Sequence, residues 1–154
     1  MSEFKWITDG SVTSVPGFKA CGVTAGFKRS GAPDFAMIFS ETPADFAGVF
    51  TSCTFAAAPV RYDRELVKKG GKLQAAVINS GNANACTGCQ GMKNAAATAE
   101  FAGKALGISP DLVAVASTGR IGVQLPMDII QNGITLGTAA LSDRGGNDAA
   151  LCNT

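Results

Sequence analysis

Short apolar runs separated by turn residues fill the first third of the chain, and this pattern predicts strands. The segment VTSVPGFKACGVTAGFK at 12–28 is divided by a proline and several glycines into short strands and turns. Two further strand-like runs, DFAMIFS at 34–40 and AGVFTS at 47–52, flank the turn-like segment ETPAD. We therefore expect these two runs to pair as neighbouring strands in a β-rich N-terminal part.

Helical and strand-like patterns alternate along the middle of the chain. RYDRELVKKGGK at 61–72 has the composition of a short helix that ends at its glycines, and LQAAVINS at 73–80 has that of a buried strand. In QGMKNAAATAEFAGKALG at 90–107, apolar residues recur every three or four positions up to Gly107. This spacing predicts an amphipathic helix whose apolar side belongs to the core.

The same alternation continues toward the end of the sequence. VAVASTGRIG at 113–122 begins as an apolar strand, and a helix is expected from Pro126, with Met127, Ile130, Ile134 and Leu141 on one side. The last segment, NDAALCNT, begins like another amphipathic helix. Strand, helix, strand and helix in succession predict a mixed α/β fold in one domain.

Charge and composition narrow the choice of partners. Charged residues make up 16% of the 154 residues, below the typical share of about 25%, so we expect part of the surface to be buried against another chain. A net charge of +1 without a block of like charges argues against nucleic acid as the main partner. The sequence has no candidate membrane span, and MSEFKWITDG lacks a signal-peptide core. We expect a cytoplasmic protein with a small-molecule substrate.

Five cysteines and the absence of histidine limit the metal and redox chemistry. Cys86 and Cys89 have the spacing of a redox pair or of half a zinc site, but a zinc site needs two further ligands and no second pair exists. An odd cysteine count without a secretory signal also argues against a disulfide framework. We expect no metal and no cofactor, and we interpret the cysteines as small buried thiols.

The asparagine-rich segment NSGNANACTGCQG at 79–91 lies between a predicted strand and a predicted helix. Backbone amides in such a loop are able to bind an anion at the helix N-terminus. The spacing does not match a phosphate-binding loop, because six residues separate Gly81 from Gly88 and no Gly-Lys-Ser/Thr follows. A turn whose asparagine side chains cap the loop's own backbone is the better interpretation.

Thr118 and Gly119 are the candidate catalytic residues, at the end of a predicted strand. Without histidine, a hydroxyl nucleophile lacks its usual base, although a threonine at a new N-terminus uses its own α-amine. In such an enzyme the Thr118 hydroxyl and the Gly119 N–H would form an oxyanion hole. Two non-catalytic interpretations stay open at this point. The segment is a strand end with a glycine turn, or the chain is a binding protein without catalytic chemistry.

Four segments in order resemble the N-terminal part of the ornithine acetyltransferase family, also called the bifunctional glutamate N-acetyltransferase family of arginine biosynthesis. They are GVTAGFK at 22–28, AGVFTSCTFAAAPV at 47–60, NSGNANACTGCQG at 79–91 and STGRIGVQLPMD at 117–128. The resemblance implies a precursor that cleaves itself at an Ala-Thr bond into an α chain and a β chain. The new N-terminal threonine takes acetyl from N-acetylornithine and passes it to glutamate, and bifunctional members also accept acetyl-CoA.

The resemblance also implies the roles of individual residues and the architecture. The oxyanion pair of the family matches Thr118 and Gly119, whereas the cleavage motif and the nucleophilic threonine have no match in this sequence. Residues 1–154 would thus be the α-chain part of a layered α-β-β-α sandwich, inactive alone and assembled with its β chain as two α and two β chains. The alternatives are a non-catalytic small-molecule binding module and a self-cleaving threonine amidohydrolase or aminopeptidase.

Overall fold

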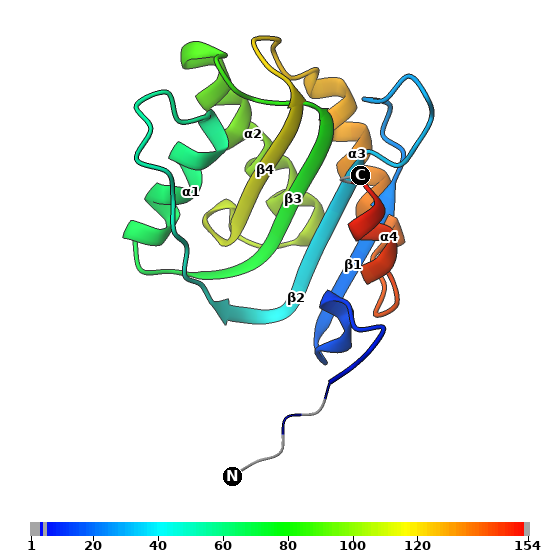
Figure 1. The fold of residues 1–154 in the computed structure, drawn as a ribbon. Helices are drawn as coiled ribbons and strands as arrows, with labels where there is room; N and C mark the ends of the chain where they lie inside the picture. The colour runs from blue at the N-terminus through cyan, green and yellow to red at the C-terminus, as the bar shows by residue number, and fades with distance from the viewer. Residues whose placement is uncertain (1–3, 5, 153–154) are drawn as a thin grey trace.

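A single four-stranded sheet organises the computed structural model, which describes residue 4 and residues 6–152 (Figure 1). The strands follow the order of the sequence across the sheet, and they are β1 (Phe18–Val23), β2 (Phe35–Asp45), β3 (Lys72–Asn82) and β4 (Val113–Arg120). β2 is antiparallel to both β1 and β3, whereas β3 and β4 are parallel. The mixed α/β fold expected from the sequence is confirmed.

Three helices cover one face of the sheet, and they are α1 (Ala58–Lys68), α2 (Gly88–Leu106) and α3 (Met127–Ala140). On the opposite face, α4 (Gly146–Leu151) packs on β1 and β2, next to the short 3-10 helix η1 (Val12–Ser14). A second 3-10 turn, η2 (Pro110–Leu112), leads into β4. Within the described part of the chain, no helix has the length and apolar character to cross a membrane.

The predicted helices form with small shifts at their ends. α1 begins at Ala58, before the expected start, because Pro59 fits the first helical turn, where its missing N–H is not needed. The helix ends at Lys68, just before Gly70 takes a φ of 68°. α2 ends as predicted, since Gly107 adopts the left-handed conformation with a φ of 70° and caps the helix.

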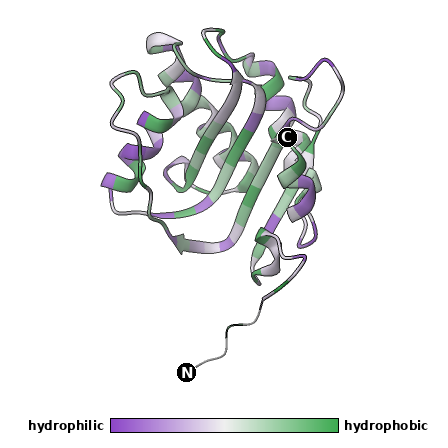
Figure 2. Cartoon of the chain, in the orientation of Figure 1, coloured by the Kyte–Doolittle hydropathy of each residue, from purple (hydrophilic) through white to green (hydrophobic). Residues whose placement is uncertain are grey.

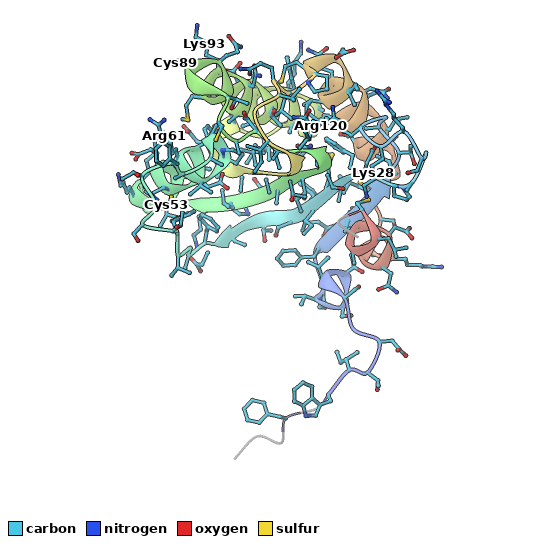
Figure 3. All side chains as sticks on the ribbon, turned by 45° about the horizontal axis from the view of Figure 1, so that its top comes forward. Lys28, Cys53, Arg61, Cys89, Lys93 and Arg120 are labelled. Carbon is cyan, nitrogen blue, oxygen red and sulfur yellow. The ribbon has the colours of Figure 1, made fainter. Side chains whose placement is uncertain are left out.

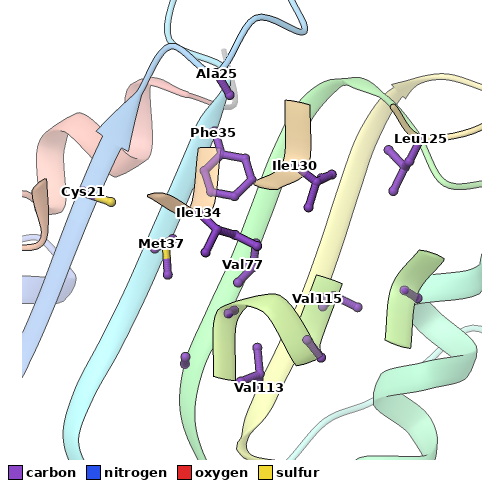
Figure 4. Packing of buried hydrophobic residues seen from close by; sticks show 14 of the residues in the cluster. Cys21, Ala25, Phe35, Met37, Val77, Val113, Val115, Leu125, Ile130 and Ile134 are labelled. Atoms are coloured by element: carbon purple, nitrogen blue, oxygen red, sulfur yellow. The ribbon is translucent and has the colours of Figure 1, made fainter. Parts of the chain in front are cut away.

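The main core lies between the sheet and the three-helix layer (Figure 4). Phe35 and Met37 of β2 meet Ile130 and Ile134 of α3, and all four side chains are buried. The core side of β3 and β4 is set by alternation, with Val77, Val113 and Val115 pointing to the helices. The alanine stripe of α2 packs against these strands, as its spacing predicts, and the small side chains allow close approach.

The predicted strand at 47–52 does not form, and this expectation was wrong. β2 continues through the ETPAD segment to Asp45, with an irregularity of its pairing between Phe39 and Ala44 that accommodates Pro43. Because β2 already pairs with β1 and β3, neither of its edges is free for another strand. The apolar run becomes a loop held by Arg64, whose guanidinium donates to the Thr51 carbonyl oxygen at 2.7 Å.

The face of β3 and β4 opposite the three-helix layer is not covered by a helix within the described residues (Figure 1). Its apolar side chains come from alternate positions of the central strands and include Ile38, Ala76, Ile78, Ala114 and Ala116, of which Ile38 and Ile78 also pack against the cluster beside α4. Figure 2 shows hydrophobic residues along these strands. A shallow cavity of about 260 Å³ on this face is lined by Ile38, Ala76 and Ala114 together with Phe18. We call this surface the open sheet face.

Candidate functional site

Thr118 and Gly119 lie at the carboxyl end of β4, beside the carboxyl end of β3. The parallel register pairs Ser80 with Thr118 and Gly81 with Gly119. Both Thr118 and Gly119 are exposed, whereas Ser80 is buried. The structure thus brings the predicted pair to the surface at the edge where the asparagine-rich loop leaves β3. We call Gly81, Thr118 and Gly119 the glycine corner.

A close backbone contact makes glycine necessary at this corner. Gly119 has a φ of 122° and Gly81 a φ of 105°, which L side chains rarely adopt. A Cβ atom on Gly119 would lie 2.7 Å from the Asn82 nitrogen and in even tighter overlap with the Gly81 carbonyl carbon. Gly81 and Gly119 are far apart in the sequence, and only the pairing register of β3 with β4 brings them into contact.

The backbone of β4 has one edge paired and one edge open, because β4 is the last strand of the sheet. On the β3 side, the Arg120 carbonyl oxygen accepts the Ala83 N–H at 2.9 Å. On the other side, the Val113 N–H donates to the Pro110 carbonyl oxygen and the Val115 N–H donates to the Asp63 carboxylate. Since successive residues alternate in direction, the N–H groups of Ser117 and Gly119 face the open edge too. Gly119 therefore offers a backbone donor at the surface.

The Thr118 side chain follows the opposite alternation. Val113 and Val115 point to the helices, so Thr118 belongs to the open sheet face, and among the described residues its hydroxyl has no hydrogen-bond partner. A hydroxyl above the sheet and an N–H at the adjacent edge are able to donate to one oxygen atom of a ligand. The arrangement is thus compatible with the predicted oxyanion pair.

The asparagine-rich loop caps its own backbone, as predicted from its composition. Asn79 Nδ2 donates to the Asn82 carbonyl oxygen at 2.8 Å, and Asn84 Nδ2 donates to the Gly91 carbonyl oxygen at 2.8 Å. The Thr87 hydroxyl donates to Asn84 Oδ1 at 2.6 Å, which closes the turn at the start of α2. These side chains are committed to the protein itself, which argues against the phosphate interpretation.

The loop also holds the segment that follows the corner. Gly122 N–H donates to the Ala85 carbonyl oxygen at 2.9 Å, and Asn82 Nδ2 donates to the Val123 carbonyl oxygen at 3.1 Å. The Gln124 side-chain amide adds a bond of 2.9 Å to the Thr87 carbonyl oxygen. The segment that follows the corner is therefore held by the asparagine-rich loop.

Asp34 orders the β1–β2 loop next to the glycine corner, and the sequence analysis did not identify it. Its fully buried carboxylate accepts backbone N–H groups of the β1–β2 loop, from Ala25 at 2.6 Å and from Lys28 at 2.8 Å. This loop places Phe27 against Gly81, so that a Cβ on Gly81 would lie 3.1 Å from the Phe27 Cβ. Figure 3 shows Lys28 and Arg120 toward the same end of the sheet. In the sequence, the only sign of this role is an acidic residue directly before an apolar strand.

Asp63 of α1 stands at the open edge of β4. Its carboxylate accepts the Val115 N–H at 3.1 Å, across 52 positions of sequence. Burial raises the pKa of the Asp63 carboxyl to about 6, partly opposed by the Val115 hydrogen bond. Nothing in the helical pattern of 61–72 marked this carboxylate, because its partner lies on a distant strand.

The cysteines do not all behave as buried thiols, so that expectation was wrong for part of the set. Cys21 and Cys152 are buried, and burial raises the pKa of both thiols. Cys53, Cys86 and Cys89 are exposed. Cys53 and Cys86 lie on loops, whereas Cys89 lies in the first turn of α2, and Figure 3 shows Cys53 and Cys89. All five are free thiols, and no group of three potential metal ligands occurs among the described residues.

The fold and the site together define the class of protein. The chain is an α/β protein with a mixed four-stranded sheet, and its candidate site lies at the carboxyl ends of the two parallel strands. Residues 19–154 match the ArgJ family, and the chain belongs to that family. The family resemblance predicted from the sequence motifs is therefore confirmed.

Curated relatives and solved structures agree with this assignment. The arginine biosynthesis bifunctional proteins ArgJ of Thermosynechococcus vestitus and Gloeobacter violaceus are 49% and 47% identical over 150 residues. These matches cover 97% of this chain but only 36% and 37% of the relatives, so the chain spans little more than a third of their length. Ornithine acetyltransferase of Mycobacterium tuberculosis, solved with ornithine, is 41% identical with a TM-score of 0.91, over 95% of this chain and 79% of that chain.

A second solved structure supports the same fold. The arginine biosynthesis bifunctional protein ArgJ of Bacillus halodurans is 41% identical, with a TM-score of 0.85. The match covers 93% of this chain and 74% of that chain. At 41% sequence identity and these TM-scores, this chain has the same fold as the two solved proteins, and the glycine corner lies within the matched part.

Proposed function

We propose that this chain is the α-chain part of an acetyltransferase that moves acetyl from N-acetylornithine to glutamate, with acetyl-CoA as a second donor. The reaction passes through an acyl-enzyme on the N-terminal threonine of a β chain, and Thr118 and Gly119 stabilise the tetrahedral intermediates. Membership of the ArgJ family supports the activity. The observation that carries the residue assignment is the glycine corner, with an exposed hydroxyl and an outward N–H on adjacent residues.

In this mechanism the two donors act on charge that develops during the reaction. As the threonine attacks the acetyl carbonyl, the carbonyl oxygen becomes negative, and the Thr118 hydroxyl and Gly119 N–H each donate a hydrogen bond to it. The backbone contact with Gly81 holds the Gly119 N–H in place before the charge appears, so little reorganisation is needed. The α-amine of the threonine takes the hydroxyl proton and passes it to the leaving nitrogen. Collapse of the intermediate then breaks the amide C–N bond, releases ornithine and leaves the acetyl group on the threonine as an ester.

The proposed partner is the β chain of the same precursor, in an assembly of two α and two β chains. The apolar open sheet face supports this, because a second sheet packed there would bury it and complete an α-β-β-α sandwich. The lengths of relatives also agree. This chain covers 79% of the solved Mycobacterium tuberculosis chain and 36% of the Thermosynechococcus vestitus protein, so that solved chain is less than half as long as the curated relative.

The test is Thr118→Ala in the full-length precursor, with acetyl transfer from N-acetylornithine to glutamate as the readout. Loss of one oxyanion donor should lower kcat by about a hundredfold or more and leave KM within about threefold. Thr118→Ser should retain most activity because it keeps the hydroxyl. Thr42→Ala, which removes an exposed hydroxyl from β2, is the matched control and should be neutral.

Three results would contradict the proposal. Thr118→Ala with unchanged kcat would remove Thr118 from the oxyanion hole. Release of free acetate without acetylglutamate would identify a hydrolase. Acetyl transfer by purified residues 1–154 would show that no β-chain threonine is required.

Intact-mass analysis of the purified protein should find a second chain that begins with threonine.

A further inference from the structure

We propose that Asp63 is a positioning residue for the glycine corner, because its carboxylate anchors the open edge of β4 to α1. This inference rests on the proposed function of Thr118 and Gly119. Asp63 does not face the reacting atoms, and it acts through the backbone of the strand that carries them. The argument starts from the hydrogen bonds along that edge.

The open edge of β4 presents a row of backbone N–H groups, from Val113, Val115, Ser117 and Gly119. Val113 is satisfied locally by the Pro110 carbonyl oxygen of η2. Val115 is satisfied by Asp63 at 3.1 Å. Asp63 is therefore the last acceptor from another element before the two outward amides at the corner.

Within the described residues, only one side of β4 is held by a sheet partner, so its outer side needs another constraint. An edge strand presents unpaired backbone groups that are open to pairing with other chains. The Asp63 carboxylate replaces the missing neighbour at one point, four residues before Gly119. It ties β4 to α1 at this point and so limits displacement of the strand end that carries both the Thr118 hydroxyl and the Gly119 N–H.

A second observation favours a functional reason for an acid at this position. Burial opposes the ionised form of Asp63, and no cation pairs with it among the described residues. An asparagine would make the same hydrogen bond without the cost of burying a charge. A bond to an ionised acceptor is stronger than a bond to a neutral one, so a carboxylate holds the strand edge more firmly.

The experiment compares Asp63→Ala, Asp63→Asn and wild type in the full-length precursor. In the alanine variant, hydrogen exchange at the Val115 amide should accelerate by at least about tenfold, since its acceptor is gone. kcat for acetyl transfer should fall by about tenfold or more, with KM within twofold, because displacement of the donors affects the transition state. The asparagine variant keeps an acceptor oxygen but loses the charge, so both properties should lie between those of wild type and of the alanine variant.

The matched control is Asp111→Ala, which removes an exposed carboxylate of η2 that pairs with Lys69 at 2.8 Å. It should leave Val115 exchange and kcat unchanged. If Asp63→Ala does not fold, Asp63→Ser replaces it as the variant with a shortened side chain. The inference is overturned if exchange at Val115 stays slow, or if exchange accelerates while kcat is unchanged. If Thr118→Ala retains full activity, the proposed function fails separately, and Val115 exchange still decides whether Asp63 anchors β4.

Discussion

The contact between Gly119 and Gly81 gives the sharpest prediction for the corner. Gly119→Ala adds one methyl group to a residue with a φ of 122°, and the methyl would lie 2.7 Å from the Asn82 nitrogen. The unfavourable backbone conformation costs about 1–3 kcal/mol, and forcing an extra methyl against fixed backbone costs about another 1–3 kcal/mol. We therefore expect the free energy of unfolding to fall by about 2–6 kcal/mol.

Gly122 provides a matched control three residues further along the same segment. It has a φ of 81°, and an added Cβ would meet no atom within 4 Å. Gly122→Ala should therefore lose only the backbone contribution, about 1–2 kcal/mol. The difference between the two variants measures the overlap with Gly81 and Asn82.

The assay is urea denaturation of the full-length protein, followed by fluorescence or circular dichroism, with acetyl transfer measured on the folded fraction. Gly119→Ala should also lower kcat strongly because its N–H is displaced, whereas Gly122→Ala should keep it within about threefold. Equal destabilisation by the two substitutions would refute the close approach of β3 and β4 at the corner. A fully active Gly119→Ala would refute the use of its N–H as a donor.

Further predictions concern ionisation, the asparagine-rich loop and the thiols. The folded-state pKa of Asp63, about 6, lies above its unfolded value of 3.8, so the folded state binds the extra proton and stability should fall as pH rises from about 4 to about 6. Asp63→Asn should flatten this pH dependence and raise the free energy of unfolding at pH 7.5 by about 1–3 kcal/mol, measured by urea denaturation at several pH values. An unchanged pH dependence would contradict the raised pKa of Asp63. Asn84→Ala removes a donor to Gly91 O and the acceptor for Thr87, and should lower the melting temperature by the equivalent of about 1–3 kcal/mol; an unchanged value would contradict the capping role. Peptide mapping after brief alkylation should find fast labelling at Cys53 and slow labelling at Cys152, and the reverse order would contradict the burial of the two sites.

Much of the secondary structure followed from local patterns. The alanine stripe of α2, its end at Gly107 and the strand that becomes β4 depend on side-chain spacing and on the conformational freedom of glycine, which act within a few residues. The self-capping of the asparagine-rich loop is equally local, because Asn84 and Thr87 lie within one turn. The expected strand at 47–52 failed because it was to pair with β2, and both edges of β2 are taken by β1 and β3, which no local pattern reports.

Part of the candidate site could also be predicted from local sequence, and part could not. The sequence pointed to Thr118 and Gly119 through an apolar strand that ends in small residues and through the family motifs. It determined neither the Gly81 contact, nor the Asp34 carboxylate that orders the β1–β2 loop, nor the Asp63 bond to Val115. Each of these joins segments whose distance depends on strand order and register, and those are set by the packing of the whole sheet against its helices. Residue types and local periodicity thus determined the elements and the candidate pair, whereas the tertiary structure alone decided which backbone atoms meet at the corner and which remain open to a ligand.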